Sequence, residues 1–490
     1  MKSVGVRVWG SQKQFAVWIS MVSGLNFAQA PVIFSNDRYS GISTAPFSPT
    51  QPFLNPHSWD VHLFSENIFF DSDYIYISES SVLGLISNDI ESADISNGIT
   101  GENTAHVSDY YNKDITGYHL NSDLMGPSFS LNLNLFEKDF ALGVFTRLRT
   151  QSETIEVDNY LQFTNQEIDE PILYDLGRFQ THFMNWNEIG LNIATDIFPY
   201  SQYQWIAGAN LKYEIGLDAA YVKNLEHAVM RRTSEPDFQD PETDVKTLYI
   251  SDFDVEMGYA TNYNFEADRY EYNVRGKGFG ADFGITLLNP DERDETYDFK
   301  ISLNALDIGY VRFTGDVHRF QGNDMRYVNN QVLDETDFES PQQYAQLISN
   351  EIYGTPNESL KSHSFTIGLP THIHLNLSKN IGENQFLNFD WVQRAPIFEN
   401  SLKRANTLTA SYLFNKDGIA YGGSMTALEY ENIRLGGFLR WGPLIIGSEN
   451  ILPVFVRQKK LHGLDFYIGL KIYPFWDNDM KRRNREDCRC

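Results

Sequence analysis

The chain has 490 residues, a formal net charge of −26 and an aromatic content of 14 %, which Tyr and Phe dominate. This length allows two or three ordinary domains or one large barrel. The negative charge argues against nucleic acid as a partner, because a polyanion would be repelled by most of the surface. Aromatic enrichment is typical of barrels that carry an aromatic girdle at each membrane interface.

Residues 1–28 are predicted to be a secretory signal peptide. A positively charged start precedes an apolar run from Phe15 to Leu25. This run is too short to span a bilayer as a helix, which needs roughly 20 apolar residues. Cleavage after Ala28 is favoured over cleavage after Ala30, because the second cut would leave Pro31 directly behind it.

The next segment, residues 29–56, is rich in Ser, Pro, Thr and Asn. It predicts an irregular N-terminal segment that is a candidate plug for a barrel mouth. A barrel is predicted over residues 57–476, beginning with apolar runs at 59–63 and 68–77. Residues 78–126 are mostly polar and predict a long surface loop.

The pattern that decides the fold class begins at residues 127–150. Phe129, Leu131 and Leu133 alternate with small polar residues, and a second alternating arm follows a short polar turn. Alternation with period two in both arms predicts a β-hairpin. A soluble β-sandwich would show the same alternation, so one hairpin does not separate the two architectures.

Recurrence of this pattern to the end of the chain favours a membrane barrel. The longest alternation runs over residues 205–218, with apolar residues on one face and polar residues on the other. In a membrane barrel the apolar face meets lipid and the polar face lines the lumen. The fold class predicted is all-β: a single transmembrane antiparallel β-barrel of about 14 strands, within a range of about 12–16. Residues 246–275 leave open whether the chain crosses once or forms an extra hairpin outside.

Connection lengths set the predicted orientation. Short connections alternate with long ones, and the expected arrangement is short periplasmic turns with long extracellular loops. The short turns are 136–139, 199–202, 379–385 and 415–418, and the long loops are near 151–183, 223–246 and 314–361.

The last segment, residues 477–490, is predicted to be a basic periplasmic tail. It holds the only two cysteines, Cys488 and Cys490. An exported protein without cysteine in its body does not depend on disulfides, so these thiols are interpreted as incidental. The tail itself is interpreted as solvated, and contact with an acidic periplasmic partner is the alternative.

Five stretches in order carry a resemblance to a known family. They are Gly278–Gly284, Leu306–Tyr310, Leu369–Thr371, Gly442–Asn450 and Asp465–Lys471. Together they resemble an uncharacterised family of outer-membrane β-barrels from Bacteroidota, a domain of unknown function. The resemblance implies a barrel broadly similar to long-chain fatty-acid transporters and to barrels associated with type 9 secretion. It implies no catalytic residues.

Charged and histidine residues at predicted inward positions are the candidate lumen-lining set. These are Arg147, Arg149, Lys212, Glu214, Asp218, Asp282, Lys300, His372 and His374. Opposed charges across a pore could select solutes, and they could equally form buried ion pairs that fill a closed barrel.

No catalytic, cofactor or metal residues are predicted, and the protein is not expected to be an enzyme. His372 and His374, with His363 nearby, are interpreted as polar lining rather than metal ligands. Ser362 and Ser364 flank His363 but lack an acid partner and the context of a hydrolase. The glycines from Gly276 to Gly280 lack the following helix that a phosphate-binding loop needs.

Two functions remain for such a barrel in the outer membrane of a Gram-negative bacterium. The first is a plugged anchor or accessory subunit of a surface or secretion assembly, with a protein partner as well as outer-membrane lipid. The alternative is a channel or transporter for a small solute, which could be apolar.

Overall fold

The structure is a computed structural model that describes residues 32–73, 75–87, 107–109, 115–135, 138–158, 171–199, 201–236, 244–265, 267–291, 296–322, 325–328 and 340–474. The predicted signal peptide (1–28) and basic tail (477–490), including both cysteines, lie outside these residues.

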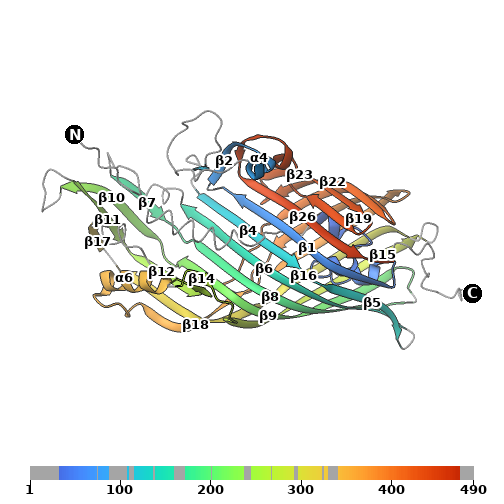
Figure 1. Cartoon of the computed structure of the whole chain (residues 1–490), viewed down its shortest axis with the longest axis horizontal. Helices are drawn as coiled ribbons and strands as arrows, with labels where there is room; N and C mark the ends of the chain where they lie inside the picture. Colours follow the sequence, from blue (N-terminus) through green and yellow to red (C-terminus); the bar gives the residue numbers. More distant parts are fainter. Residues whose placement is uncertain are drawn as a thin grey trace, which may run out of the picture.

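Strands that run obliquely around one axis form the barrel wall (Figure 1). These wall segments are β1 (Trp59–Ser72), β4 (Ile115–Met125), β5 (Ser128–Leu135), β6 (Lys138–Asp158), β8 (Gln180–Asp196), β9 (Gln204–Asn224), β12 (Phe253–Ala260), β15 (Gly276–Asp291), β16 (Thr296–Gly322), β18 (Leu360–Gly368), β19 (His372–Gly382), β20 (Gln385–Arg394), β21 (Thr407–Lys416), β22 (Ile419–Leu428), β23 (Asn432–Trp441), β24 (Leu444–Ser448) and β26 (Gly463–Ile472).

The 17 segments make a closed antiparallel barrel of 14 strands, because three wall strands are each interrupted once. The interrupted strands are β4 with β5, β12 with β15, and β18 with β19, and each pair lines up along the same neighbour. The first strand, β1, pairs with the last, β26, which closes the barrel. The predicted fold class is confirmed.

Smaller sheets and helices lie outside the 17-segment wall sheet. A four-stranded sheet holds β7 (Ile172–Leu176), β10 (Ala228–Pro236), β11 (Asp244–Ser251) and β17 (Met325–Val328), a three-stranded sheet holds β2 (Ile75–Ser80), β3 (Val107–Asp109) and β25 (Gln458–Leu461), and β13 (Tyr263–Asn264) pairs with β14 (Arg269–Tyr270). The helices within the described residues are α2 (Val32–Ser35), η1 (Gly41–Thr44), α3 (Gln51–Leu54), α4 (Val82–Ser87), α6 (Pro341–Tyr353) and α7 (Leu452–Phe455). None of the helices in the described ranges is long and apolar enough to cross a membrane.

The prediction of one long surface loop over residues 78–126 is wrong for residues 115–125, which form wall strand β4. Its inward residues His119, Asn121 and Asp123 are polar, but Ser122 interrupts the apolar face formed by Leu120 and Leu124, so the alternation is weak in the sequence. Pairing with β1 and β6 satisfies the backbone and overrides that weak pattern. The ends of β6, β8, β9 and β16 likewise extend into segments predicted to be loops.

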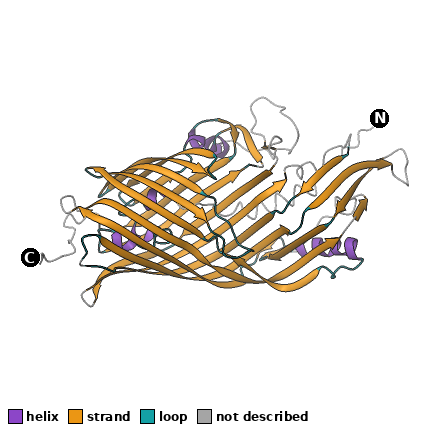
Figure 2. Ribbon diagram, turned by 180° about the vertical axis from the view of Figure 1, so that it is seen from behind, coloured by secondary structure: helices purple, strands orange, loops and turns teal. Residues whose placement is uncertain are grey.

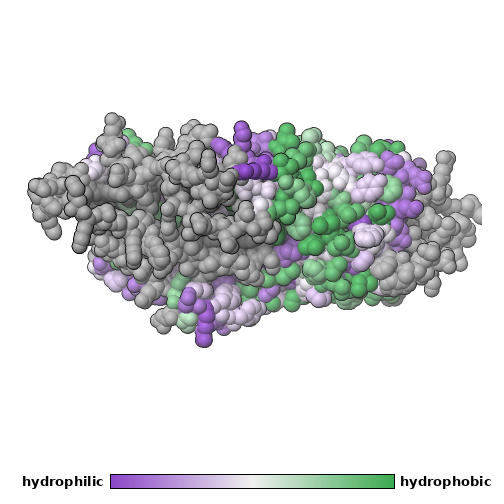
Figure 3. All heavy atoms as spheres, turned by 45° about the horizontal axis from the view of Figure 1, so that its top comes forward, coloured by the Kyte–Doolittle hydropathy of each residue, from purple (hydrophilic) through white to green (hydrophobic). Residues whose placement is uncertain are grey.

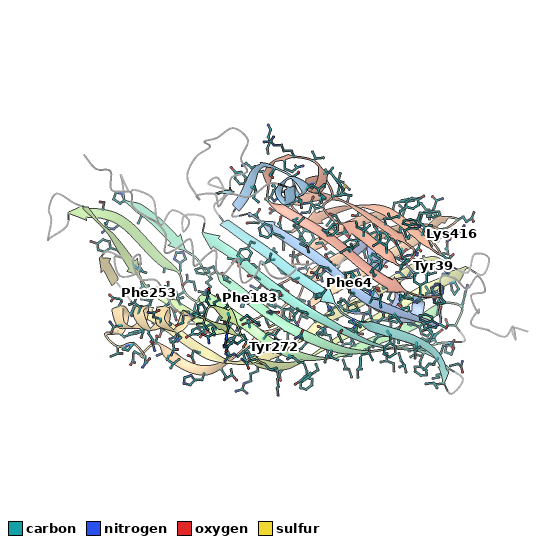
Figure 4. All side chains as sticks on the ribbon, in the orientation of Figure 1. Tyr39, Phe64, Phe183, Phe253, Tyr272 and Lys416 are labelled. Carbon is teal, nitrogen blue, oxygen red and sulfur yellow. The ribbon has the colours of Figure 1, made fainter. Side chains whose placement is uncertain are left out.

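Residues 246–275 add no further crossing of the wall. The chain runs along β12, leaves the wall after Ala260 for an excursion over residues 261–275, and re-enters as β15. Both β12 and β15 pair with β9 in the same direction, so they count as one strand. The excursion packs on the outer surface, where Tyr272 accepts a hydrogen bond from Asn187 (3.2 Å) (Figure 4).

Apolar side chains gather on the outer surface of the barrel in the half that contains the short turns (Figure 3). They include the exposed residues Leu131, Leu133, Leu135, Ile189, Leu191, Ile193, Leu211, Phe279, Phe283, Leu303 and Leu387. An outward apolar band around a polar interior is typical of a lipid-facing β-barrel. We call this half the short-turn end and the opposite half the long-loop end.

Residues 32–54, the plug, lie inside the barrel at the short-turn end. Figure 2 shows the helical turns of this segment enclosed by strands. The segment was expected to be irregular, whereas it contains the three helical turns α2, η1 and α3. Its apolar side chains Ile33, Phe34, Ile42, Phe47 and Phe53 are all buried.

Candidate functional site: the occluded barrel interior

Two buried cations tie the plug to the wall. Lys471 of β26 donates to the backbone oxygen of Ser40 (2.6 Å) and lies 2.6 Å from the Asp60 carboxylate. The Arg440 guanidinium pairs with Asp37 at 2.5 Å and lies over the Tyr39 ring at 4.9 Å. Figure 4 shows Tyr39 at this end, close to Lys416 at the end of β21. Charge-assisted hydrogen bonds of this kind are the strongest available to a polar interior.

Further hydrogen bonds tie the plug to other positions around the barrel. The pairs are Ile33 N to Glu449, Asn36 to Asp390, Asn376 to Asn36, Asn210 to the Ala45 carbonyl, Asn192 to the Pro49 carbonyl, and Thr50 to Thr286. At Gly208 the plug backbone approaches so closely that an added Cβ would lie 2.6 Å from the Pro49 carbonyl carbon. Only glycine allows this approach.

Beyond the plug lies a connected set of buried ionic side chains, the central charge cluster. Its members are Asp123, Arg147, Arg149, Glu188, Lys212, Asp282 and Asp307. Arg147 bonds Asp123 and reaches Glu188 at 3.0 Å, Arg149 reaches Asp307 at 2.8 Å, and Lys212 reaches Asp282 at 2.8 Å. Each cation therefore has at least one carboxylate partner, as burial of charge requires.

Asp307 is placed in this cluster by a local backbone distortion. Its φ is +54°, and the pairing of β16 with β15 changes register between Ala281 and Phe283. A non-glycine residue with positive φ is uncommon and is kept only where surrounding contacts compensate. Here Asp307 accepts from Arg149 and Lys212, and its own backbone N–H donates to Asp282 (2.7 Å).

A second segment enters the interior from the long-loop end. Residues 395–406, the inner loop, connect β20 to β21. Its Leu402 joins a buried apolar cluster with Trp186 and Phe313, and its Lys403 N–H donates to Glu153 (2.5 Å). Leu402 N also donates to the Gly368 carbonyl (3.1 Å). The interior is thus occupied from both ends.

A cavity of about 60 Å³ remains where the plug, the inner loop and the wall meet. Phe34 and Phe47 of the plug, Arg147, Arg149 and His372 of the wall, and Arg404 of the inner loop are among its lining residues. The Arg404 guanidinium lies 5.1 Å from the centre of the Phe47 ring, so the inner loop touches the plug directly. A volume of this size holds about four water-sized groups.

The structure places the predicted lumen residues at different sites. Arg147, Arg149, Lys212 and Asp282 belong to the central charge cluster, and Glu214 is buried beside Glu188 on the neighbouring strand.

The other predicted residues lie apart from that cluster. His372 lines the cavity, His374 pairs with Asp390 at 2.9 Å, and Lys300 is buried near Tyr297.

The placement of Asp218 in the lumen is wrong. The pairing of β8 with β9 skips Leu217, so the inward alternation passes to Ala219 and Tyr221. Asp218 instead accepts from Asn262 N–H (2.6 Å) and from the Tyr270 hydroxyl (2.5 Å), both in the excursion 261–275. One extra residue in a strand reverses the face of every residue after it.

The histidines considered as metal ligands do not converge. His363 is exposed and pairs with Asp316 at 2.7 Å, away from His372 and His374. Among the described residues no three His, Cys, Asp or Glu side chains form a group that could hold a metal ion. At Gly278 an added Cβ would lie 1.8 Å from the Tyr310 carbonyl oxygen, so this glycine permits close strand packing.

Several interior residues were not predicted as site residues, among them Asp123, Glu188, Asp307 and Arg404. Asp307 lies in one of the stretches that carry the family resemblance, and Glu188 sits on the polar face of an alternating strand. Asp123 and Arg404 lie in polar segments without a clear period, so local pattern carried no signal for them.

The plug and the inner loop both occupy the barrel interior. Within the part of the chain that the structure describes, a molecule entering from either end meets the inner loop or the plug, and small cavities of about 60 Å³ and 30 Å³ lie beside them. Passage therefore requires that both segments move.

Comparison with known proteins gives weak likeness to other barrels. The TodX deltaS2S3 mutant, a monoaromatic hydrocarbon channel, matches with 8% identity, coverage of 88% of this chain and 94% of that chain, and a TM-score of 0.28. A Pseudomonas aeruginosa FadL homologue matches with 8% identity, 88% and 94% coverage and a TM-score of 0.21, and the transport unit of the autotransporter AIDA-I from Escherichia coli with 7%, 84% and 89%, and 0.22. No curated protein matches by sequence. Residues 74–449 match the family of unknown function DUF5723, so this chain belongs to that family.

Proposed function

We propose that the protein is an outer-membrane channel for a small solute, held closed by the plug and the inner loop. The observation that carries the proposal is the cavity enclosed between these two segments, which enter from opposite ends. In this proposal the signal peptide exports the chain, the apolar band meets lipid, and the short-turn end faces the periplasm.

The charged side chains of the interior support a path for a solute, rather than a set of side chains that only fill the barrel. Buried ion pairs can often be replaced by well-packed apolar side chains without loss of stability. The central charge cluster nevertheless keeps seven ionic side chains inside the barrel. Charged residues within membrane proteins commonly mark solute or ion pathways.

Conductance of the reconstituted full chain tests this proposal. The double variant Asp37→Asn/Arg440→Gln removes one ionic tie of the plug without leaving an unpaired buried charge. We expect the wild type to conduct rarely in planar bilayers and the double variant to open more often. If a folded double variant and a folded variant lacking residues 32–54 both remain non-conducting, the channel proposal is wrong.

A second candidate function rests on a different observation. The sheet of β7, β10, β11 and β17 projects beyond the wall at the long-loop end (Figure 1). Such a sheet could receive a protein partner through strand addition, as an accessory subunit of a surface assembly would. Purification from native membranes in mild detergent tests this candidate: a stoichiometric partner lost on shortening the β10–β11 hairpin supports it, and a lone chain contradicts it.

A further inference from the structure

We infer that the cavity is a binding site for a carboxylate and that Arg404 is the residue that binds it. This inference rests on the proposed function, because it names the chemical class of the solute. It is carried by the bonding state of one buried guanidinium.

Arg404 is buried, with 8% of its surface exposed, yet it is incompletely bonded. Its Nη1 lies 3.3 Å from His372 Nε2. The other ring nitrogen of His372 lies 2.9 Å from the Pro370 carbonyl oxygen, so Nδ1 carries the proton and Nε2 accepts from Arg404. Within the described residues, Arg404 Nε and Nη2 have no hydrogen-bond partner.

The other cations that line or adjoin the cavity differ from Arg404 in this respect. Arg147, Arg149 and Lys212 each contact at least one carboxylate of the central charge cluster. Asp123 and Asp307 also line the cavity, but their charges are already engaged by those cations. Two neutral lining residues, Asn67 and Tyr467, also have a buried polar hydrogen-bonding atom without a partner among the described residues. Among the described cations that line or adjoin the cavity, Arg404 is therefore the one with no carboxylate contact and with unpartnered donors, and an unsatisfied buried donor costs free energy.

The missing partner is an acceptor that matches a planar fork of N–H groups. A carboxylate fits this geometry and can accept two parallel hydrogen bonds. The cavity has room for about four water-sized groups, which corresponds to a ligand of acetate size. Phe34, Phe47 and Met125 give one part of its lining an apolar character suited to a short carbon chain.

Two kinds of solute share this chemistry. A simple carboxylate would use Arg404 alone. An amino acid would add an ammonium group, for which Glu66 is the candidate acceptor, because Glu66 lines the cavity and its Oε1 has no hydrogen-bond partner among the described residues. Both classes of solute contain a carboxylate, and the experiment below distinguishes a simple carboxylate from an amino acid.

The test is calorimetric titration of the purified full chain in detergent micelles with sodium acetate and, separately, with glycine, at constant ionic strength with chloride. We expect saturable binding that Arg404→Gln weakens by about tenfold or more, as loss of a charged hydrogen bond implies. The matched control is Arg319→Gln, which removes an arginine paired with Asp254 at 2.5 Å near the rim, and it should bind as the wild type does.

The second variant, Arg404→Lys, keeps the charge but loses the planar fork, and it should bind with intermediate affinity. It serves as the test if Arg404→Gln fails to fold. Glu66→Gln should weaken glycine binding alone if the solute is an amino acid.

The outcomes separate the two proposals. The inference is overturned if the wild type binds neither acetate nor glycine, or if Arg404→Gln binds both as the wild type does. If the wild type binds neither ligand but conductance still rises when the plug is released, the channel proposal holds and the proposal of a carboxylate ligand is wrong. If the wild type binds a carboxylate through Arg404 but no variant conducts, the carboxylate site holds and the channel proposal is wrong.

Discussion

The two segments that fill the barrel are held differently, and the difference indicates which can move first. The plug is bonded to β8, β9, β15, β19, β20, β23 and β26, which are half of the 14 wall strands. The inner loop is bonded to fewer strands, namely β6, β8, β18, β19 and β20, and it buries Leu402 and Ala405 in two apolar clusters. A segment with fewer buried contacts opens at lower free-energy cost. The inner loop is therefore expected to be the first gate and the plug the second.

The largest effect is expected for a variant that weakens the plug, the segment with more bonds to the wall. Arg440→Ala leaves the buried Asp37 carboxylate without its guanidinium, and loss of one partner of a buried pair costs about 3–5 kcal/mol. Urea unfolding in detergent, followed by tryptophan fluorescence, measures this loss. The Asp37→Asn/Arg440→Gln variant should lose clearly less, and equal losses would show that the pair does not behave as a buried charge pair.

Leu402→Ala tests the anchor of the inner loop. Leu402 is fully buried, so its truncation should cost about 2–5 kcal/mol locally. Hydrogen exchange should rise over residues 395–406 while residues 32–54 keep their protection. The matched control is Leu439→Ala on the outer face, where 39% of the side chain is exposed. Equal exchange in plug and inner loop would contradict separate gates.

Gly208→Leu tests the close approach of plug and wall. The new side chain would collide with the Pro49 backbone and should cost about 1–3 kcal/mol through overpacking. Hydrogen exchange of residues 50–54 should increase, since the plug must shift. Ala209→Leu, one residue along and not among the fully buried side chains, is the control. If both variants exchange alike, the plug does not depend on this contact.

The smallest effect on the free energy of unfolding is expected for a variant at the rim of the barrel. Arg319 pairs with Asp254, and 38% of the Arg319 side chain is exposed. Pairs this exposed contribute about 0–1 kcal/mol, so Arg319→Gln should change urea unfolding by no more than that and leave hydrogen exchange of the plug and inner loop unchanged. A larger change would mean that the rim couples to the interior.

The strands with strong alternation were predictable. In β5 and in residues 188–194 of β8 the outward residues are apolar and the inward residues polar or small, so periodicity identified both the strand and its two faces. The prediction failed where the signal is weak or local geometry interrupts it. In β4 Ser122 interrupts the apolar face of a short strand, and in β9 the skipped Leu217 moves Asp218 to the other face.

The sequence by itself determined a barrel with an apolar outer band, because period-two alternation is a local property of each strand. It also marked residues 29–56 as a separate segment and placed several charges on the inner face. Only the tertiary structure decided that the plug is folded into helical turns, that Arg147, Arg149 and Lys212 meet the same set of carboxylates, and that Arg404 meets Phe47. These contacts join residues far apart in the chain, so their geometry is set by barrel closure and strand register and not by any local pattern.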